Sequence, residues 1–197
     1  MRVAVTYGAS GTLSKQIVAG APVDVVVFAG PRPVDELVER GLADPDSRRV
    51  IATNSLVLVA ADGNAEFGFD NIEELPEGER LAIGDPGSAP VGHYARQALR
   101  ALGKWEAIRH RLVLGGDVAM VLAYARRREV AAAIVYATDL SDVEDLRVLD
   151  RASGRWAPRP EVVAGAIGES RRARRFIEFL ESDKGQRLLD ARGFDAP

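Results

Sequence analysis

An alternation of strand-like and helix-like segments runs along this 197-residue chain and limits the folds that it can adopt. Short apolar runs predict strands, and apolar residues at helical spacing predict helices. The strands are expected at Val3–Thr6, Val25–Ala29, Leu56–Ala60, Leu81–Ile83, Ala132–Tyr136, Val148–Leu149 and Val162–Ala166. The helices are expected at Pro33–Arg40, Val91–Leu102, Val118–Arg126, Arg172–Leu180 and Gly185–Ala191. This alternation is typical of an α/β protein with largely parallel sheets.

Two segments are expected to carry the chain between two lobes. One is the pair Asn54-Ser55, and the other is Trp156–Pro160, whose two prolines favour extended chain over helix. We therefore predict hinge crossings near residues 53–57 and 156–162. Lobe 1 is expected to comprise residues 1–55 and 158–197, and lobe 2 is the inserted segment 56–157.

The charge of the chain argues against nucleic acid as a partner. The formal net charge is −3, whereas binding to phosphate backbones needs a basic surface. The basic run Arg171–Arg175 lies beside Glu178 and Glu181 on a helical pattern, so we expect it to be a solvated helix face.

The chain has no cysteine, which excludes disulfides, thiolate catalysis and cysteine-based zinc sites. No stretch approaches the roughly 20 apolar residues of a membrane span. Met1-Arg2-Val3 runs directly into a strand pattern, so no secretory signal is visible. The sequence is therefore expected to be cytoplasmic, already processed, or without its natural beginning.

Four segments carry uncharged hydrogen-bond donors. Three of them lead into a helical pattern, and the fourth is the end of an expected strand. They are Gly8–Thr12, Gly84–Gly92, Gly115–Val118 and Tyr136. The first three predict helix N-termini, where unpaired N–H groups and the positive end of the helix dipole favour an anion. Tyr136 adds a phenolic donor. Together they predict a site for a small dianion that needs no cation.

Nucleotide and metal sites fit the sequence less well. The turn Gly8–Lys15 superficially resembles a phosphate loop, but Lys15 does not directly follow the second glycine, and neither Ser nor Thr follows it. His93 and His110 are the only histidines and lack the spacing of metal ligands. We expect His93 to be a residue on a helix face, and we expect no cofactor and no protein ligands to a metal.

An enzyme is a further alternative. Asp85 and Asp117 form a possible carboxylate pair, although helix capping and loop turns explain both more simply. Ser10 and His93 are the only candidates for a nucleophile and base of a hydrolase, and nothing in the sequence fixes their geometry. We therefore expect a binding protein with no catalytic residues.

In this order, the segments resemble the substrate-binding proteins of bacterial molybdate ABC transporters. The resemblance covers essentially the whole chain, and its linked blocks are specific in combination. The matching segments are Ala9–Ile17, Ala19–Asp24, Asn54–Val59, Leu81–Pro86, Pro90–Ala95, Leu102–Trp105, Gly116–Val118, Ala133–Tyr136 and Gly193–Phe194.

The resemblance implies a two-lobed periplasmic-binding-protein fold of type II that closes on molybdate or tungstate between its lobes. By position, the ligand-binding residues are Ser10, Ala29, Val91, Val118 and Tyr136. Ser10 is expected to bind through its hydroxyl and N–H, and Tyr136 through its phenol. The other three residues are expected to donate backbone N–H groups. All are contacts to the oxyanion rather than direct metal ligands.

The same resemblance implies a monomer that delivers its ligand to the permease of an ABC importer from a periplasmic or extracytoplasmic location. The alternative is a cytoplasmic module of the same fold that senses an effector and regulates transcription. A helix-turn-helix region encoded upstream would favour the sensor, and an encoded signal peptide would favour the importer.

Relatives of this kind begin with a further strand, a serine-bearing turn and a helix before the segment that corresponds to residues 3–6. We therefore expect a first lobe that is truncated at its N-terminus, with exposed strand edges and low stability. The loss of one or two charge-assisted donors, at roughly 1.5–3 kcal/mol each, is expected to weaken ligand binding about tenfold to ten-thousandfold.

Overall fold

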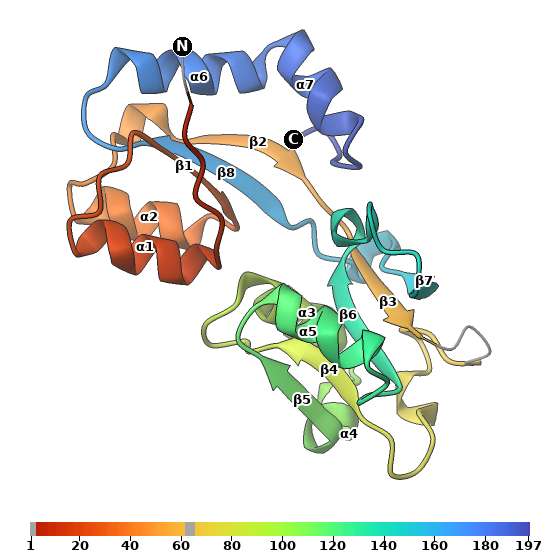
Figure 1. The fold of residues 1–197 in the computed structure, drawn as a ribbon. Coiled ribbons are helices and arrows are strands. Elements are labelled where there is room, and N and C mark those ends of the chain that lie inside the picture. The colour runs from red at the N-terminus through yellow and green to blue at the C-terminus, as the bar shows by residue number, and fades with distance from the viewer. Residues whose placement is uncertain (1–2, 62–65) are drawn as a thin grey trace.

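The computed structural model describes residues 3–61 and 66–197, and it groups their elements around two sheets (Figure 1). The first sheet has the strand order β1-β8-β2 and consists of β1 (Val25–Ala29), β8 (Glu161–Ala166) and β2 (Arg49–Thr53). Its helices are α1 (Ser10–Val18), α2 (Arg32–Glu39), α6 (Arg171–Glu181) and α7 (Asp183–Asp190). We call this group of elements lobe 1.

The second sheet has five strands in the order β5-β4-β6-β3-β7. They are β3 (Leu56–Ala60), β4 (Leu81–Gly84), β5 (Leu112–Gly115), β6 (Ala132–Tyr136) and β7 (Arg147–Arg151). Its helices are α3 (Pro90–Ala101), α4 (Trp105–Ile108) and α5 (Val118–Arg126). We call this group lobe 2. Short 3-10 turns cover Pro45–Ser47, Ile72–Glu74, Arg109–Arg111, Ala137–Leu140 and Gly154–Trp156.

Both faces of the second sheet are buried, which explains its continuous apolar strands. Along β3, Leu56 and Leu58 belong to one core cluster, whereas Val57 and Val59 belong to another. The helix α3 covers the first face through Ala95 and Leu99, and α5 covers the second. The first sheet likewise separates two smaller clusters, one packed on α1 and α2 and the other on α6.

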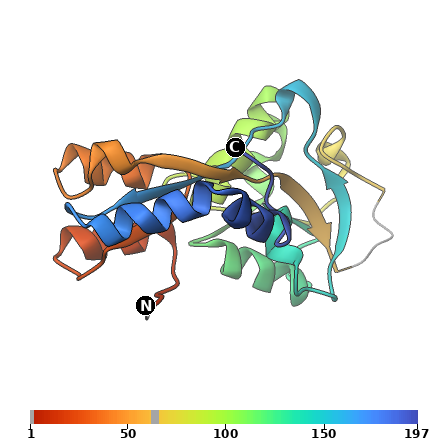
Figure 2. The same ribbon diagram turned by 90° about the horizontal axis from the view of Figure 1, so that it is seen from above.

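The chain crosses between the lobes twice (Figures 1 and 2). Only Asn54 and Ser55 separate β2 from β3. The return crossing runs from β7 to β8 and includes Pro160, whose carbonyl accepts a hydrogen bond from the Asn54 N–H at 2.8 Å. Thr53 also exchanges two backbone hydrogen bonds with Asp195 near the C-terminus. The two crossings and the C-terminal segment therefore lie against one another.

The α/β class is confirmed, but the prediction of largely parallel sheets is wrong. Only β4 pairs in parallel, with β5 and with β6. The pairings of β8 with β1 and β2, and of β3 with β6 and β7, are antiparallel. The reason is that β3 and β8 enter their sheets from the opposite lobe and therefore run against their neighbours.

The predicted strand Val3–Thr6 does not form. Residues 3–9 have no regular secondary structure, and Val3, Val5 and Tyr7 are 58%, 61% and 88% exposed. Apolar alternation predicts a strand only where a neighbouring strand edge is available, and the ladder pairs β1 with β8 alone. Two strands were not predicted, namely β2 and β5.

The outer edge of β1 predicts self-association. Within the described part of the chain this edge has no paired strand, and Val27 on it is 44% exposed. An exposed apolar strand edge is a template for pairing with another chain, and a lysine there opposes such pairing. We expect Val27→Lys to reduce oligomer formation at high concentration in sedimentation velocity, with a change in stability within about 0.5 kcal/mol.

The matched control is Val18→Lys, because Val18 is 42% exposed but ends a helix instead of lying on a strand edge. Equal self-association of the wild type and both variants would contradict the prediction.

None of the helices in the described residues is long and apolar enough to cross a membrane.

Candidate functional site

Lobe 1 contributes the start of α1 to the predicted anion site. Ser10 is the first residue of this helix and is only 8% exposed. Its Oγ accepts a hydrogen bond from the Ala29 N–H at 3.2 Å, so the hydroxyl proton is left to donate. The first intrahelical bonds are made by Thr12 and Leu13 to the Ala9 carbonyl. The N–H groups of Ser10 and Gly11 therefore precede the helical ladder, as expected at an N-terminus.

Lobe 2 contributes the starts of α3 and α5. Pro90 opens α3 and has no N–H, so Val91 carries the first donor of this helix, and the ladder begins with Gly92 to Ala89. Val118 opens α5 after Asp117, whose carboxylate accepts the Met120 N–H at 2.9 Å. Asp117 is therefore a helix cap, as the sequence predicts.

Tyr136 ends β6, and its side chain supplies the most informative atom of the site. The residue is 7% exposed, and its hydroxyl is buried without a hydrogen-bond partner among the described residues. Buried polar atoms are rarely left unpaired, because each lost hydrogen bond has a free-energy cost. Burial raises the pKa of Tyr136 well above its usual value, and Tyr94 and Asp139 add to that shift. The phenol is therefore a neutral donor that lacks an acceptor.

The structure brings the predicted residues together where the two lobes meet. A Cβ on Gly11 of α1 would lie 3.3 Å from the Ser88 carbonyl of lobe 2. Ala29 of lobe 1 packs against the lobe 2 core cluster that contains Val91 and Tyr136, as does Val118. The Ala29 N–H, predicted to reach the ligand, instead donates to Ser10 in this structure.

Close packing fixes the direction of α3. A Cβ on Gly92 would overlap the carbonyl of Gly84, and one on Gly84 would lie 2.6 Å from a methyl group of Val91. These two glycines let the first turn of α3 lie directly on the end of β4. The Val91 N–H is thereby held at the carboxyl end of the sheet, where ligands of α/β proteins bind.

Two nearby carboxylates are accounted for by local hydrogen bonds. Asp85 accepts from the Gly87 N–H at 2.9 Å and from the Ser88 hydroxyl at 2.9 Å, and these bonds lower its pKa. Asp139 accepts the Tyr136 N–H at 3.0 Å, and burial raises its pKa to about 6. Sequence reasoning did not find Asp139, although its place three residues after Tyr136 is the spacing of a capping box.

In the described residues, Ser10 and His93 form no hydrogen bond with each other. His93 is exposed on α3 and makes an edge-on contact with Tyr94, while the Ser10 hydroxyl is bonded to Ala29. Burial and nearby arginines lower the pKa of His93. A search of the described residues finds no group of three His, Asp or Glu side chains able to hold a metal ion.

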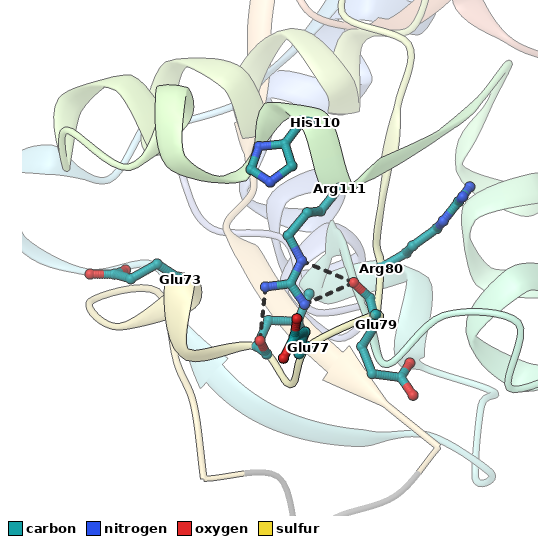
Figure 3. A pocket seen from close by; sticks show the side chains of 8 residues that line it. Glu73, Glu77, Glu79, Arg80, His110 and Arg111 are labelled. Carbon is teal, nitrogen blue, oxygen red and sulfur yellow. Dashed lines mark hydrogen bonds between the residues drawn. The ribbon is translucent and has the colours of Figure 1, made fainter.

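A cavity of about 540 Å³ lies elsewhere, against the 3-10 turn that ends at Arg111 in lobe 2 (Figure 3). Its lining includes Glu73, Glu77 and Glu79, whose charge disfavours an oxyanion. The Arg111 guanidinium is occupied by main-chain carbonyls, with bonds to Leu75 at 2.8 Å and to Glu79 at 2.9 and 3.1 Å (Figure 3). This arginine therefore holds the 75–79 loop in place.

Two lobes with uncharged hydrogen-bond donors at their junction are typical of solute-binding proteins. The description "Bacterial extracellular solute-binding protein" belongs to the family profile that matches residues 1–195. The chain is a member of this family and groups with its molybdate-binding proteins.

Two relatives and one solved structure define this grouping. The molybdate-binding protein ModA of Haemophilus influenzae is 32% identical in an alignment of 206 positions that covers 98% of this chain and 79% of the relative. A putative ABC transporter substrate-binding lipoprotein of Bacillus subtilis, YvgL, is 31% identical over 96% of this chain and 74% of its own length. The periplasmic molybdate-binding protein of Azotobacter vinelandii has a TM-score of 0.84 at 22% identity, over 100% of this chain and 88% of that one, which confirms the fold.

Proposed function

We propose that this protein captures molybdate or tungstate between its lobes and delivers the oxyanion to the permease of an ABC importer. The observation that carries the proposal is the buried hydroxyl of Tyr136, which has no hydrogen-bond partner in the described part of the chain and lies where the starts of α1, α3 and α5 meet. Ser10, Val91, Val118 and Tyr136 are the proposed donors, and Ala29 supports Ser10. The names of the relatives support molybdate as the ligand.

The chemistry of this donor set suits a tetrahedral dianion. Helix N-termini and hydroxyls supply partial positive charge, so a tetrahedral dianion can accept hydrogen bonds from them without a lysine or arginine as counter-ion. Hydrogen bonds to a charged group are worth roughly 1.5–3 kcal/mol each. A few such bonds therefore suffice for tight binding.

Selectivity among oxyanions is proposed to come from the size of the anion and from whether the anion carries a proton. Sulfate is smaller than molybdate and cannot contact every donor at once, and each unmade bond leaves a buried donor unsatisfied. Hydrogen phosphate carries a proton that needs an acceptor, and the site is composed mainly of donors. The protein is proposed to act as a monomer. Its proposed location is outside the cytoplasm, as the descriptions of its family and relatives suggest.

Titration calorimetry at pH 8 with molybdate, tungstate, sulfate and phosphate tests the proposal. We expect saturable heat with molybdate and tungstate, and affinities at least about tenfold lower for sulfate and phosphate, since one lost charge-assisted bond corresponds to that ratio. The absence of heat with both molybdate and tungstate would overturn the proposed function. Stronger binding of sulfate would overturn the assignment of the ligand.

A further inference from the structure

Tyr94 connects the two lobes beside the proposed site. It lies on α3 of lobe 2, one turn after Val91, and its ring packs against the lobe 2 core. Its Oη accepts a hydrogen bond at 3.3 Å from the N–H of Glu161, the first residue of β8 in lobe 1. A single side chain of one lobe therefore satisfies a main-chain donor of the other.

The contact replaces one bond of the lobe 1 ladder. The Gly30 N–H donates to the Glu161 carbonyl at 2.7 Å, which continues the antiparallel pairing of β1 and β8 by one residue. In such a pair the Glu161 N–H would return a bond to residue 30, and here it donates to Tyr94 instead. Tyr94 thus occupies a position in the lobe 1 hydrogen-bond pattern.

Gly30 lies directly beside this contact. Its φ of +92° lies in the region that favours glycine, and the chain turns away from the sheet at this point. A Cβ at this position would lie 3.7 Å from the Tyr94 Oη and 3.8 Å from Pro90, the first residue of α3. The start of α3 therefore lies directly against the end of β1.

Both ends of the contact lead to proposed ligand donors. On the lobe 2 side, Tyr94 shares its helix with Val91. On the lobe 1 side, Gly30 follows Ala29, whose N–H holds the Ser10 hydroxyl. A change in the distance between Tyr94 and Glu161 therefore changes the distance between Ser10 and Val91, the donors on opposite sides of the ligand.

We propose that Tyr94 is a positioning residue for anion capture: its hydroxyl fixes the separation of the lobes and thereby prolongs the lifetime of the bound anion. This inference rests on the proposed function, because its affinity test needs a bound oxyanion. It assigns to Tyr94 no contact with the anion itself.

Tyr94→Phe removes the hydroxyl and keeps the ring. We expect the Kd for molybdate to rise about two- to tenfold, the range that corresponds to one neutral hydrogen bond. Stopped-flow measurements should assign the change to faster dissociation, with association little altered, since donors in the open protein are untouched. Thermal unfolding without ligand should stay close to that of the wild type. The matched control is Tyr124→Phe, because Tyr124 is also half-buried in lobe 2 but packs on the opposite face of the sheet.

An unchanged Kd and dissociation rate in Tyr94→Phe would overturn the inference. Equal weakening in Tyr124→Phe would also overturn it, because a general loss of packing would then explain the result.

A second measurement is independent of the ligand. The chain has no cysteine, so Glu39→Cys on α2 and Gln97→Cys on α3, both at exposed positions, allow one spin label on each lobe. We expect Tyr94→Phe to broaden or lengthen the interlobe distance distribution without any oxyanion. An identical distribution would overturn the inference. If the wild type bound neither molybdate nor tungstate, the proposed function would fail while this distance measurement would still decide whether Tyr94 fixes the lobes.

Discussion

Tyr136→Phe is expected to weaken molybdate binding about tenfold to hundredfold while the unliganded protein becomes no less stable. The two effects differ because the Tyr136 hydroxyl is buried and has no hydrogen-bond partner among residues 3–61 and 66–197. A donor to a dianion contributes roughly 1.5–3 kcal/mol, which corresponds to this loss of affinity. A buried hydroxyl without a hydrogen bond destabilises the folded protein by the free energy of its desolvation. Its removal from the unliganded protein therefore takes away this penalty and breaks no hydrogen bond.

Calorimetry gives the affinity, and urea unfolding without oxyanion gives the stability. We expect the unfolding free energy of Tyr136→Phe to equal or exceed that of the wild type. Tyr124→Phe is again the control, since it removes a phenol hydroxyl from a half-buried tyrosine on the opposite face of the sheet and should change neither measurement by more than about 0.5 kcal/mol.

Two results would contradict this assignment. A marked loss of stability without ligand would mean that the hydroxyl has a structural partner. Undiminished molybdate binding would remove Tyr136 from the donor set. In either case the orphaned oxygen would no longer support an anion site at the junction of the lobes.

The strength of local patterns explains which elements the sequence predicts. The strands β3 and β6 and the helix α5 have the predicted bounds, because each combines a strong apolar pattern with clear ends. The strand β2 could not be predicted from its local sequence. It begins with the polar Arg49, and its pairing with β8 joins residues more than 100 positions apart. The direction of a strand could not be predicted either, because a short apolar run occurs in both parallel and antiparallel sheets.

The site could be predicted where the chemistry is local. Ser10, Val91 and Val118 stand at helix starts that follow glycine-rich turns, and Tyr136 ends an apolar strand. Ala29 came only from the resemblance to molybdate-binding proteins, because nothing in its own surroundings marks it.

Tyr94 and Asp139 could not be predicted as parts of the site. The pattern of an amphipathic helix predicts that Tyr94 is a core residue. Glu161, whose N–H donates to the Tyr94 hydroxyl, is 67 positions away in the sequence. An aspartate in a turn reads as a solvated residue. Only the three-dimensional structure shows that Asp139 is largely withdrawn from water beside Tyr136.

The buried carboxyl of Asp139 leads to a prediction about pH. Burial raises its pKa from 3.8 to about 6, although the hydrogen bond from the Tyr136 N–H acts in the opposite direction. The folded protein therefore binds this proton more tightly than the unfolded chain does. The Asp139 contribution is most favourable below pH 4, declines as the pH rises from about 4 to 6, and stays low above that range.

Asp139→Asn should remove this pH dependence. The asparagine Oδ1 accepts the same Tyr136 N–H but carries no charge, so burial no longer opposes it. At pH 8 we expect the variant to be more stable than the wild type by up to about 3 kcal/mol, the equivalent of the shift in pKa. At pH 4 the difference should fall to about 0.5 kcal/mol, because Asp139 is then neutral in the folded protein and only partly ionised in the unfolded chain. Urea unfolding at pH 4, 5, 6, 7 and 8 measures the difference.

Asp142→Asn is the matched control, because Asp142 lies three residues further along the chain and is exposed. This control should follow the wild type at every pH. A variant Asp139→Asn that is less stable than the wild type at pH 8 would show that the ionised carboxylate is stabilised by its surroundings. With a pKa of about 6 the wild-type carboxyl is ionised at pH 8 in either case, so the sign of the difference reports on the stability of that charge in the fold.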